Sequence, residues 1–331
     1  MSPSPADWDD FEQEEELRTD VHLAIDLALD SILDNRGREI TAVEEEKLTF
    51  FAIRDLNIDL SYSWYLAGGN TEVGPTPTPD TSYTPGQQFG TIQQDTPTTD
   101  RLTRLRNYFR NETFFGDYNL AKVWYTDRYT FLRDYYSKFA PEEYTDLYIT
   151  SVNIREKLTN LDNLIATESQ NATLGDFGGG GSNSLLESAD EREIRYLISD
   201  FHMDLTATDE LSQTKQVVSA GTDLIEQVLF KLTQIEGTTR EQRRLLNNLS
   251  ELFFYYIWKY PALLISADTA TGPNEDIIRL NRLQEFERFN QQVESEISRL
   301  TDHFYEVGLL PNAQDIEAID MDSENNIIYP E

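Results

Sequence analysis

Apolar side chains recur every three or four residues over most of this chain, and this period restricts the possible folds more than any other feature. In the first periodic segment, residues 9–35, it is carried by Leu17, Val21, Ile25, Ala28 and Ile32. Such spacing places the apolar side chains on one face of an α-helix. The sequence therefore predicts a mainly α protein.

Helix boundaries follow from this period together with capping signals. Thr41 and Glu44 have the spacing of a capping box, which satisfies free backbone donors at a helix start. The predicted helices cover residues 9–35, 42–56, 101–111, 117–139, 141–168, 189–206, 209–236, 239–266 and 275–308. The last four have short connections, which predict a C-terminal four-helix bundle.

Two segments without helical periodicity divide the chain. Residues 67–100 hold five prolines among Thr, Gly and Gln, which predicts a flexible loop. Residues 169–184 include four consecutive glycines and predict a linker. We therefore expect an N-terminal helical domain at 1–168, a bundle at 185–308 and an acidic tail at 309–331.

One stretch departs from the helical pattern. Residues 57–64, NIDLSYSW, alternate polar and apolar side chains, which is typical of a half-buried strand. Leu56, Leu60 and Trp64 are also four residues apart, so continuation of the preceding helix is the alternative. The tail stretch 318–329, AIDMDSENNIIY, predicts a β-hairpin. A lone strand leaves its backbone unpaired, so we expect the strand to pair with this hairpin in a small β element.

The charge of the chain is extreme. Asp and Glu number 60 against 27 Lys and Arg, giving a formal net charge of −33 that is spread along the whole sequence. In molar salt the Debye length falls to about 3 Å, so repulsion between carboxylates is screened. The composition is typical of proteins from halophilic archaea and predicts a cytoplasm of high salt concentration.

Targeting and membrane signals are not visible in the sequence. The N-terminal residues MSPSPADWDDFEQEEELRTD are acidic and polar, unlike a secretory signal. The most apolar stretch, 252–267, carries Lys259 and Pro261 and is shorter than a membrane span. The sequence therefore predicts a cytoplasmic protein without membrane association.

A local pattern resembles known proteins. The apolar stretch KLTFFAIRDL followed by LSYSWYLAGG is similar to haloarchaeal proteins of unknown function. These are in turn similar to the helical domain of some antitoxin-like proteins, in which a Leu/Phe-rich helix precedes an aromatic stretch and a Gly-Pro pair. Here Gly68 and Gly69 stand where Gly-Pro is expected, and Gly74-Pro75 follows after an insertion. The resemblance covers residues 47–75 and assigns no role to any residue.

The segment 101–139 is unusual in this acidic chain. It holds eight Lys and Arg against four Asp and Glu, and twelve of the chain's aromatic residues. Cations beside aromatic rings suit nucleic acids, so Arg101, Arg104, Arg106 and Arg110 are candidate contacts with a partner or a nucleic acid. The alternative, which the sequence favours, is a central core helix whose arginines pair with acidic helices. Binding led by phosphate contacts would also weaken steeply in molar salt.

Signatures of catalysis and metal binding are missing from the sequence. Each of the three histidines has an Asp nearby, but none has the Glu three residues earlier that a di-metal bundle needs. The stretch DMDSENNIIYPE lacks the glycine of a calcium loop. The sequence has no cysteine and no glycine-rich phosphate loop. We therefore expect no catalytic, cofactor-binding or metal-binding residue and no cofactor.

These observations predict an interaction or regulatory protein rather than an enzyme, with one or more protein partners. The first alternative is a nucleic-acid-associated protein that uses residues 101–139. The second is an enzyme whose carboxylates assemble only in the folded chain, since acidic pairs are too abundant here to be recognised from sequence.

Overall fold

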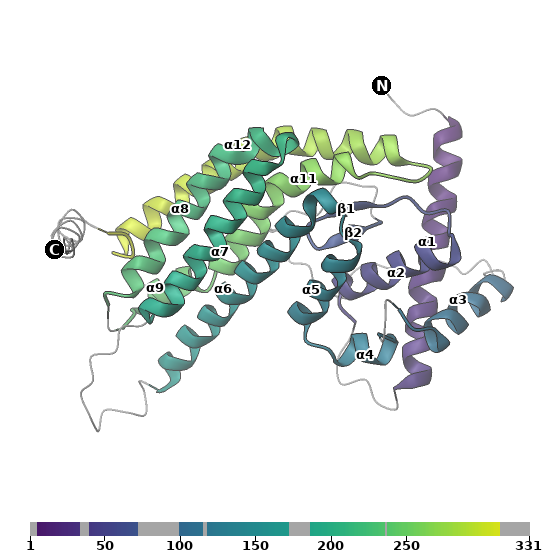
Figure 1. Ribbon diagram of the computed structural model, residues 1–331, viewed down its shortest axis with the longest axis horizontal. Coiled ribbons are helices and arrows are strands. Elements are labelled where there is room, and N and C mark those ends of the chain that lie inside the picture. Colours follow the sequence, from purple (N-terminus) through teal and green to yellow (C-terminus); the bar gives the residue numbers. More distant parts are fainter. Residues whose placement is uncertain are drawn as a thin grey trace, which may run out of the picture. The chain divides into compact units, whose positions relative to one another are not determined.

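The computed structural model describes residues 5–33, 40–71, 99–114, 118–171, 186–235 and 237–311. Within these residues the protein is mainly α with one small two-stranded sheet, as predicted (Figure 1). The elements are α1 (Pro5–Ile32), α2 (Ala42–Leu56), β1 (Ser63–Tyr65), β2 (Gly68–Asn70), α3 (Thr99–Asn111), α4 (Leu120–Tyr125), α5 (Arg128–Phe139), η1 (Glu142–Tyr144), α6 (Thr145–Asn171), α7 (Ser188–Ala207), η2 (Asp209–Thr214), α8 (Lys215–Leu232), α9 (Arg240–Leu246), α10 (Leu249–Leu252), the π-helix η3 (Phe253–Trp258), α11 (Lys259–Asp268) and α12 (Glu275–Glu306).

The chain forms two compact units. Unit 1 consists of Met1–Ile149 and Pro261–Arg288, and unit 2 of Thr150–Tyr260 and Phe289–Glu331. The division falls inside helices α6, α11 and α12. Helix α6 ends at Asn171, so the first residues of the predicted linker 169–184 are helical. The rest of that linker lies outside the described residues.

Helix α2 connects the elements that surround the candidate site in unit 1. It packs against α1 and β2, and α1 also packs against α3. The predicted capping box is confirmed: the Glu44 N–H donates to Thr41 Oγ1 at 3.3 Å, and the Thr41 N–H donates to Glu44 Oε2 at 2.9 Å. At the other end Asn57 has a left-handed backbone with φ of 51°. Helix α2 therefore stops before the alternating stretch, which excludes the alternative of a continued helix.

The predicted strand at 57–64 forms only at its end. Strand β1 pairs antiparallel with β2, with Ser63 opposite Asn70 and Tyr65 opposite Gly68. Strand β1 thus finds a partner after a two-residue turn, and the predicted pairing with the tail hairpin at 318–329 stays a prediction. The tail hairpin itself lies outside the described residues.

The polar side of the alternating stretch is exposed at Asn57 and Asp59 but buried in its second half, at Ser61 and Ser63. Ser61 Oγ donates to Glu14 Oε1 of α1 at 2.6 Å, and Ser63 Oγ lies 2.7 Å from Ser266 Oγ of α11. Both serines are fully buried. Because their hydroxyls have hydrogen-bond partners, burial leaves them satisfied.

The predicted loop 67–100 also begins later than expected, since β2 and Thr71 belong to the folded core. The Thr71 N–H donates to Glu46 Oε2 of α2 at 2.8 Å, and Arg18 Nη2 of α1 donates to the Thr71 carbonyl at 2.7 Å. The two helices thus fix the chain where it leaves the hairpin. Residues 72–98 lie outside the described residues.

The single helix predicted at 117–139 is two helices, α4 and α5. Asn119 caps α4, because its Oδ1 accepts the Lys122 N–H at 2.9 Å. Asp127 caps α5 in the same way, with Oδ2 accepting the Thr130 N–H at 2.9 Å. A side-chain oxygen that satisfies a free backbone donor favours a new helix start, so the chain bends at residues 126–127.

The predicted helices at 209–236 and 239–266 are subdivided as well. The first begins with the 3₁₀ turn η2 before α8, and the second is split into α9, α10, η3 and α11. Pro261 in α11 has no backbone N–H to donate. A π turn next to such a position is a recognised way for a helix to accommodate a missing hydrogen bond.

A buried lysine attaches the β-hairpin to α2. Lys47 is 1% exposed, and its Nζ donates to the Gly69 carbonyl of β2 at 2.9 Å. Its ammonium group also lies 5.5 Å from the centre of the Tyr135 ring. Burial lowers the pKa of Lys47 to about 7, with the positive charge of Arg128 acting in the same direction and Glu46 opposing it.

A buried arginine holds the other side of the hairpin. Arg282 of α12 is fully buried; its Nε donates to Ser266 Oγ at 3.1 Å and its Nη1 pairs with Glu285 at 3.2 Å. The guanidinium lies 4.4 Å from the centre of the Tyr65 ring of β1. The hairpin is therefore in contact with two buried cations, one from α2 and one from α12.

Candidate functional site

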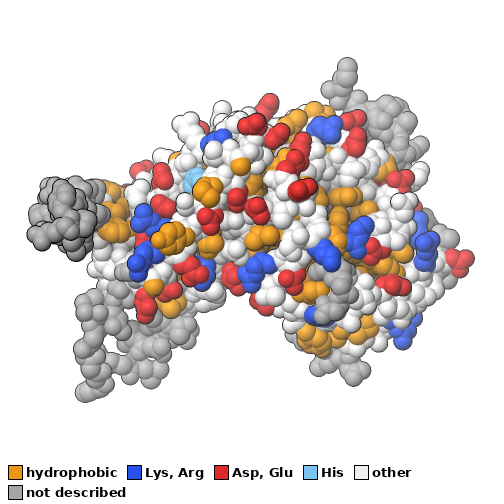
Figure 2. Space-filling view, in the orientation of Figure 1, with side chains coloured by type: hydrophobic (Ala, Val, Ile, Leu, Met, Phe, Trp, Pro, Cys, Tyr) orange, Lys and Arg blue, Asp and Glu red, His pale blue; other side chains and the backbone are white. Residues whose placement is uncertain are grey.

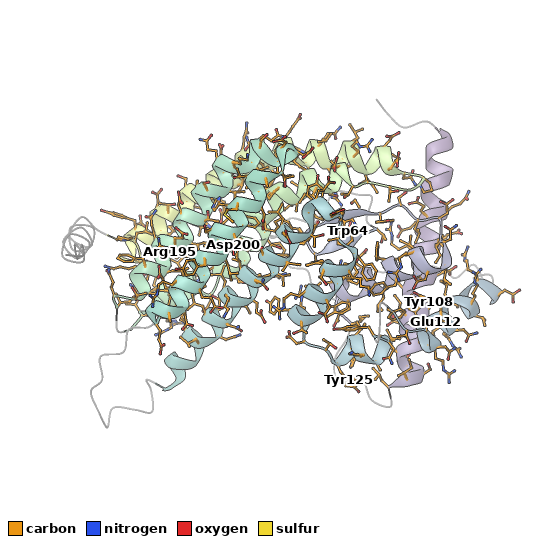
Figure 3. All side chains as sticks on the ribbon, viewed as in Figure 1. Trp64, Tyr108, Glu112, Tyr125, Arg195 and Asp200 are labelled. Atoms are coloured by element: carbon orange, nitrogen blue, oxygen red, sulfur yellow. The ribbon has the colours of Figure 1, made fainter. Side chains whose placement is uncertain are left out.

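Aromatic side chains of residues 101–139 form much of the core of unit 1. The buried ones are Tyr108, Phe109, Phe114, Tyr118, Trp124, Phe131, Tyr135 and Tyr136. The Tyr135 ring stacks on Trp64 of β1, which is labelled in Figure 3, with 5.5 Å between ring centres. Tyr125 differs, at 73% exposed. The prediction of a core is confirmed for the buried aromatic residues of this segment.

The four arginines singled out from the sequence are all exposed on α3. Arg101 pairs with Asp20 of α1: its Nε donates to Asp20 Oδ2 at 2.6 Å and its Nη2 contacts the same oxygen. Among the described residues, no carboxylate pairs with Arg104, Arg106 or Arg110. The expected pairing with acidic helices therefore holds, within the described part of the chain, for Arg101.

The structure does not bring the four arginines together. Successive residues of an α-helix are about 100° apart around its axis, so Arg106 and Arg110 lie roughly opposite to Arg101 and Arg104. The buried residues of α3 occupy the face toward the rest of unit 1. Arg101 and Arg104 line the same pocket, and we take these two as the candidate site residues.

The pocket lies between α1, the end of α2 and α3, and its volume is about 250 Å³. Its wall is apolar over one part and charged or polar over the rest. The lining residues are Leu17, Leu56, Asn57, Ile58, Asp59, Arg101, Arg104 and Leu105. Such a mixture of aliphatic and charged side chains suits an amphipathic ligand rather than a purely ionic one.

Buried polar contacts hold the walls of the pocket in place. Glu14 is 4% exposed and accepts the Ser61 hydroxyl, which fixes the segment after α2 against α1. Ser61 Oγ in turn accepts the Asn274 N–H at 2.7 Å. The ion pair of Arg101 with Asp20 ties α3 to α1. The pocket is therefore formed before any ligand binds.

An acid–base pair joins α1 and α2. His22 Nδ1 is 3.5 Å from Glu45 Oε1. Burial raises the pKa of Glu45 to about 7, and the carboxylates of Glu46 and Asp26 act in the same direction. Burial also lowers the pKa of His22 to about 4, with Arg18 contributing. Between these two values the pair consists of a neutral imidazole beside a protonated carboxyl group.

Sequence reasoning missed this pair because it grouped His22 with its neighbours Asp20 and Asp26. The carboxyl that faces the imidazole comes from a different helix, one residue after the capping-box Glu44. Neither His22 nor Glu45 lines the pocket. We therefore assign the pair no catalytic role, although shifted pKa values of this kind often accompany function.

Glu45→Gln is expected to flatten the pH dependence of stability. The folded-state pKa of Glu45 lies above its unfolded value, so its stabilising contribution is complete below about pH 4.5 and is lost as the pH rises through 7. The glutamine side chain resembles the protonated carboxyl group and stays neutral as the pH rises. The variant therefore keeps this stabilising contribution. The variant should match the wild type at pH 5 and exceed it at pH 8 by on the order of 2 kcal/mol in free energy of unfolding.

Urea unfolding at constant KCl and at both pH values measures this difference. Glu16→Gln on α1 is the control, because Glu16 is exposed and its removal should shift the stability equally at both pH values. Parallel pH profiles for Glu45→Gln and the wild type would contradict the assignment of a raised pKa to Glu45.

The histidines do not assemble into a metal site in the described part of the chain. No group of three or more His, Asp or Glu is placed there to hold a metal ion. His202 Nε2 lies 2.8 Å from Thr222 Oγ1, and His303 Nδ1 lies 3.2 Å from Arg299 Nη1. Among the same residues, no helix combines the length and the apolar character needed to cross a bilayer.

Comparison with known proteins gives one match. The model of a family described as a domain of unknown function (DUF8098) matches residues 8–329, across both compact units. No curated protein matches the chain, and no solved structure matches it. A family of unknown function agrees with the resemblance seen at residues 47–75, whereas the haloarchaeal origin and the antitoxin similarity stay predictions.

Proposed function

Because the chain belongs to a family whose function is unknown, DUF8098, we propose its function from the arrangement of its own residues. It is a non-enzymatic interaction protein that binds an acidic partner protein on the side of α3 that carries Arg101 and Arg104. The pocket beside these two arginines is the centre of the contact surface.

Arg104 is the observation that carries this proposal. Carboxylates outnumber cations 60 to 27 in the chain, so most exposed arginines would be expected to have an acid close by. Arg104 is exposed at the rim of a pocket, and no carboxylate of the described residues pairs with it. A guanidinium offers a planar set of donors that fits a carboxylate, so it is suited to an acidic partner.

The burial of the aromatic residues supports a protein partner over a nucleic acid. Binding to single strands needs exposed rings on which bases stack. The rings of Tyr108 and Phe109, which lie between the arginines in sequence, are 6% and 0% exposed. Among the residues drawn in colour, Lys and Arg side chains are interspersed with Asp and Glu on the visible face (Figure 2). That distribution differs from the continuous basic surface that nucleic-acid binding needs.

The amino-acid composition supports a cytoplasm of high salt concentration as the solvent in which this interaction takes place. A net charge of −33 with few lysines suits a cytoplasm of molar salt, in which long-range attraction is screened and close contacts remain. A contact that combines one ion pair with apolar burial is suited to such a solvent, because salts do not weaken apolar burial. We place the protein in a halophilic cytoplasm on this ground.

A photo-reactive amino acid at position 59, within the pocket lining, tests the proposal in cells grown at native salt. We expect a crosslinked protein that mass spectrometry identifies and that nuclease treatment leaves intact. Arg104→Glu should abolish the product because it puts a negative charge where the acidic partner binds. Arg106→Glu on the other side of α3 should leave it unchanged, and both variants should unfold within about 0.5 kcal/mol of the wild type.

Three results would contradict the proposal. A crosslink that disappears on nuclease treatment would indicate a nucleic-acid partner. If Arg104→Glu and Arg106→Glu reduce the crosslinked product equally, α3 attracts the partner only through its total charge. A melting temperature that falls in Arg104→Glu would assign that arginine to the core instead of the surface.

A further inference from the structure

We propose that the pocket between α1, α2 and α3 receives a single aliphatic side chain whose neighbouring carboxylate pairs with Arg104. The occupant is an exposed segment of another protein in which Leu, Ile or Val stands next to Asp or Glu. This inference rests on the proposed function, since it names the part of the acidic partner that the site recognises.

The volume of the pocket limits what can enter it. At about 250 Å³ it lies below the range of roughly 300–1,000 Å³ that is usual for drug-sized ligands. It therefore suits one side chain of a larger partner better than a cofactor or nucleotide. Interfaces often depend on such an anchor residue, which fills a small preformed pocket.

The apolar part of the wall determines the kind of side chain. Leu17, Leu56 and Ile58 are each partly exposed there, while Leu105 is 3% exposed. These four aliphatic side chains come from α1, from the end of α2 and from α3. An aliphatic side chain of the partner would cover them, whereas a polar one would lose its water without gaining a hydrogen bond from this part of the wall.

The charged part of the wall sets the number of negative charges that the ligand carries. Asp20 pairs with Arg101, whereas no carboxylate of the described residues pairs with Arg104, the other cation of the lining. Asp59 lies in the same lining and repels a second anion. One carboxylate per binding site fits this balance better than the doubly charged phosphate of a phosphopeptide or the repeated phosphates of a nucleic acid.

Synthetic peptides test this inference directly. The probe is a fluorescent nine-residue peptide with blocked ends and asparagine–leucine–glutamate at its centre. One comparison peptide has asparagine–leucine–glutamine there, and a second has asparagine–serine–glutamate. We expect both comparison peptides to bind at least tenfold more weakly in fluorescence anisotropy, because each lacks one of the two recognised groups.

Matched arginine variants locate the peptide in the pocket. Arg104→Gln should weaken binding of the probe peptide about tenfold, while Arg110→Gln, on the same helix but not in the pocket lining, should change binding less than twofold. With one ionic contact, the affinity should fall about tenfold or less for a tenfold rise in KCl. Single-stranded DNA bound through several phosphates would show a much steeper dependence.

Each contrary result has a definite meaning. Equal weakening by Arg104→Gln and Arg110→Gln, or equal binding of all three peptides, would overturn the pocket as the recognition site. Absence of peptide binding to the wild type up to millimolar concentration would also overturn it. If the nuclease-resistant crosslink at position 59 persists in that case, the proposed function stands and only the identity of the recognised segment is wrong.

Discussion

Arg282→Ala is expected to lower the free energy of unfolding by about 3–5 kcal/mol, since removal of one partner from a buried ion pair leaves the other charge uncompensated. Arg282 has no exposed surface, and its guanidinium pairs with Glu285, donates to Ser266 and covers the ring of Tyr65. Alanine removes these contacts together and leaves a cavity beside the β-hairpin. Urea unfolding monitored by circular dichroism measures the loss.

Two further variants separate charge from packing at this position. Arg288→Ala on the same helix is the control, because Arg288 is exposed and its Nε bonds to the carbonyl of its own helix at Gln284; its loss should be below about 1 kcal/mol. Adding Glu285→Gln to Arg282→Met should recover part of the stability that Arg282→Met loses, because it removes the uncompensated charge. A cost for Arg282→Ala no larger than that for Arg288→Ala would refute the structural role of the buried arginine.

The second large effect is the dependence of stability on pH through Lys47. The pKa of this lysine is about 7 in the folded protein and 10.5 in an unfolded chain. Between these values the unfolded chain binds the proton that the folded protein has released, so stability rises as the pH rises from 7. From pH 7 to 9 this single group should add on the order of 2 kcal/mol to the free energy of unfolding.

Lys47→Met removes this contribution, so the stability of the variant should rise much less over the same pH range. Absolute stability is a poorer readout, because methionine also leaves the Gly69 carbonyl without its donor. Lys138→Met, at an exposed position on α5, should keep the wild-type slope. Identical slopes for Lys47→Met and the wild type would show that Lys47 keeps an ordinary pKa in the fold.

Local interactions are the part of this fold that the sequence predicts well. The capping box of Thr41 and Glu44 depends on residues three apart, and it is present as predicted. Helical periodicity likewise predicts a mainly α protein with a small β element. Boundaries that depend on one capping side chain were missed, as at Asp127, where a new helix starts in the middle of a periodic segment.

Contacts between distant residues could not be predicted from the pattern. The pairing of β1 with β2, Gly68–Asn70, was missed because β2 has no alternating pattern and precedes a proline-rich segment. Ser61 and Ser63 looked solvated because their partners, Glu14 and Ser266, are remote in sequence. The burial of Arg282 could not be predicted either, because the ring that it covers, Tyr65, is remote in sequence.

The candidate site was predictable from the sequence in one respect, the division of its arginines, but not in another, its pocket. The arithmetic of a helix already separates Arg101 and Arg104 from Arg106 and Arg110, so this division was accessible from the sequence. The pocket was not, because its walls come from three segments and its shape depends on the left-handed turn at Asn57.

The burial of Glu45 and Lys47 in the same turn of α2 has a consequence for the protons that the protein exchanges with its solvent. Glu45 has a pKa of about 7 in the folded state, above its unfolded value, and Lys47 has a pKa of about 7, below its unfolded value. On unfolding near neutral pH, Glu45 therefore releases protons to the solvent while Lys47 takes them up. The two transfers run in opposite directions, so each residue reduces the buffer dependence of the heat of unfolding that the other would cause.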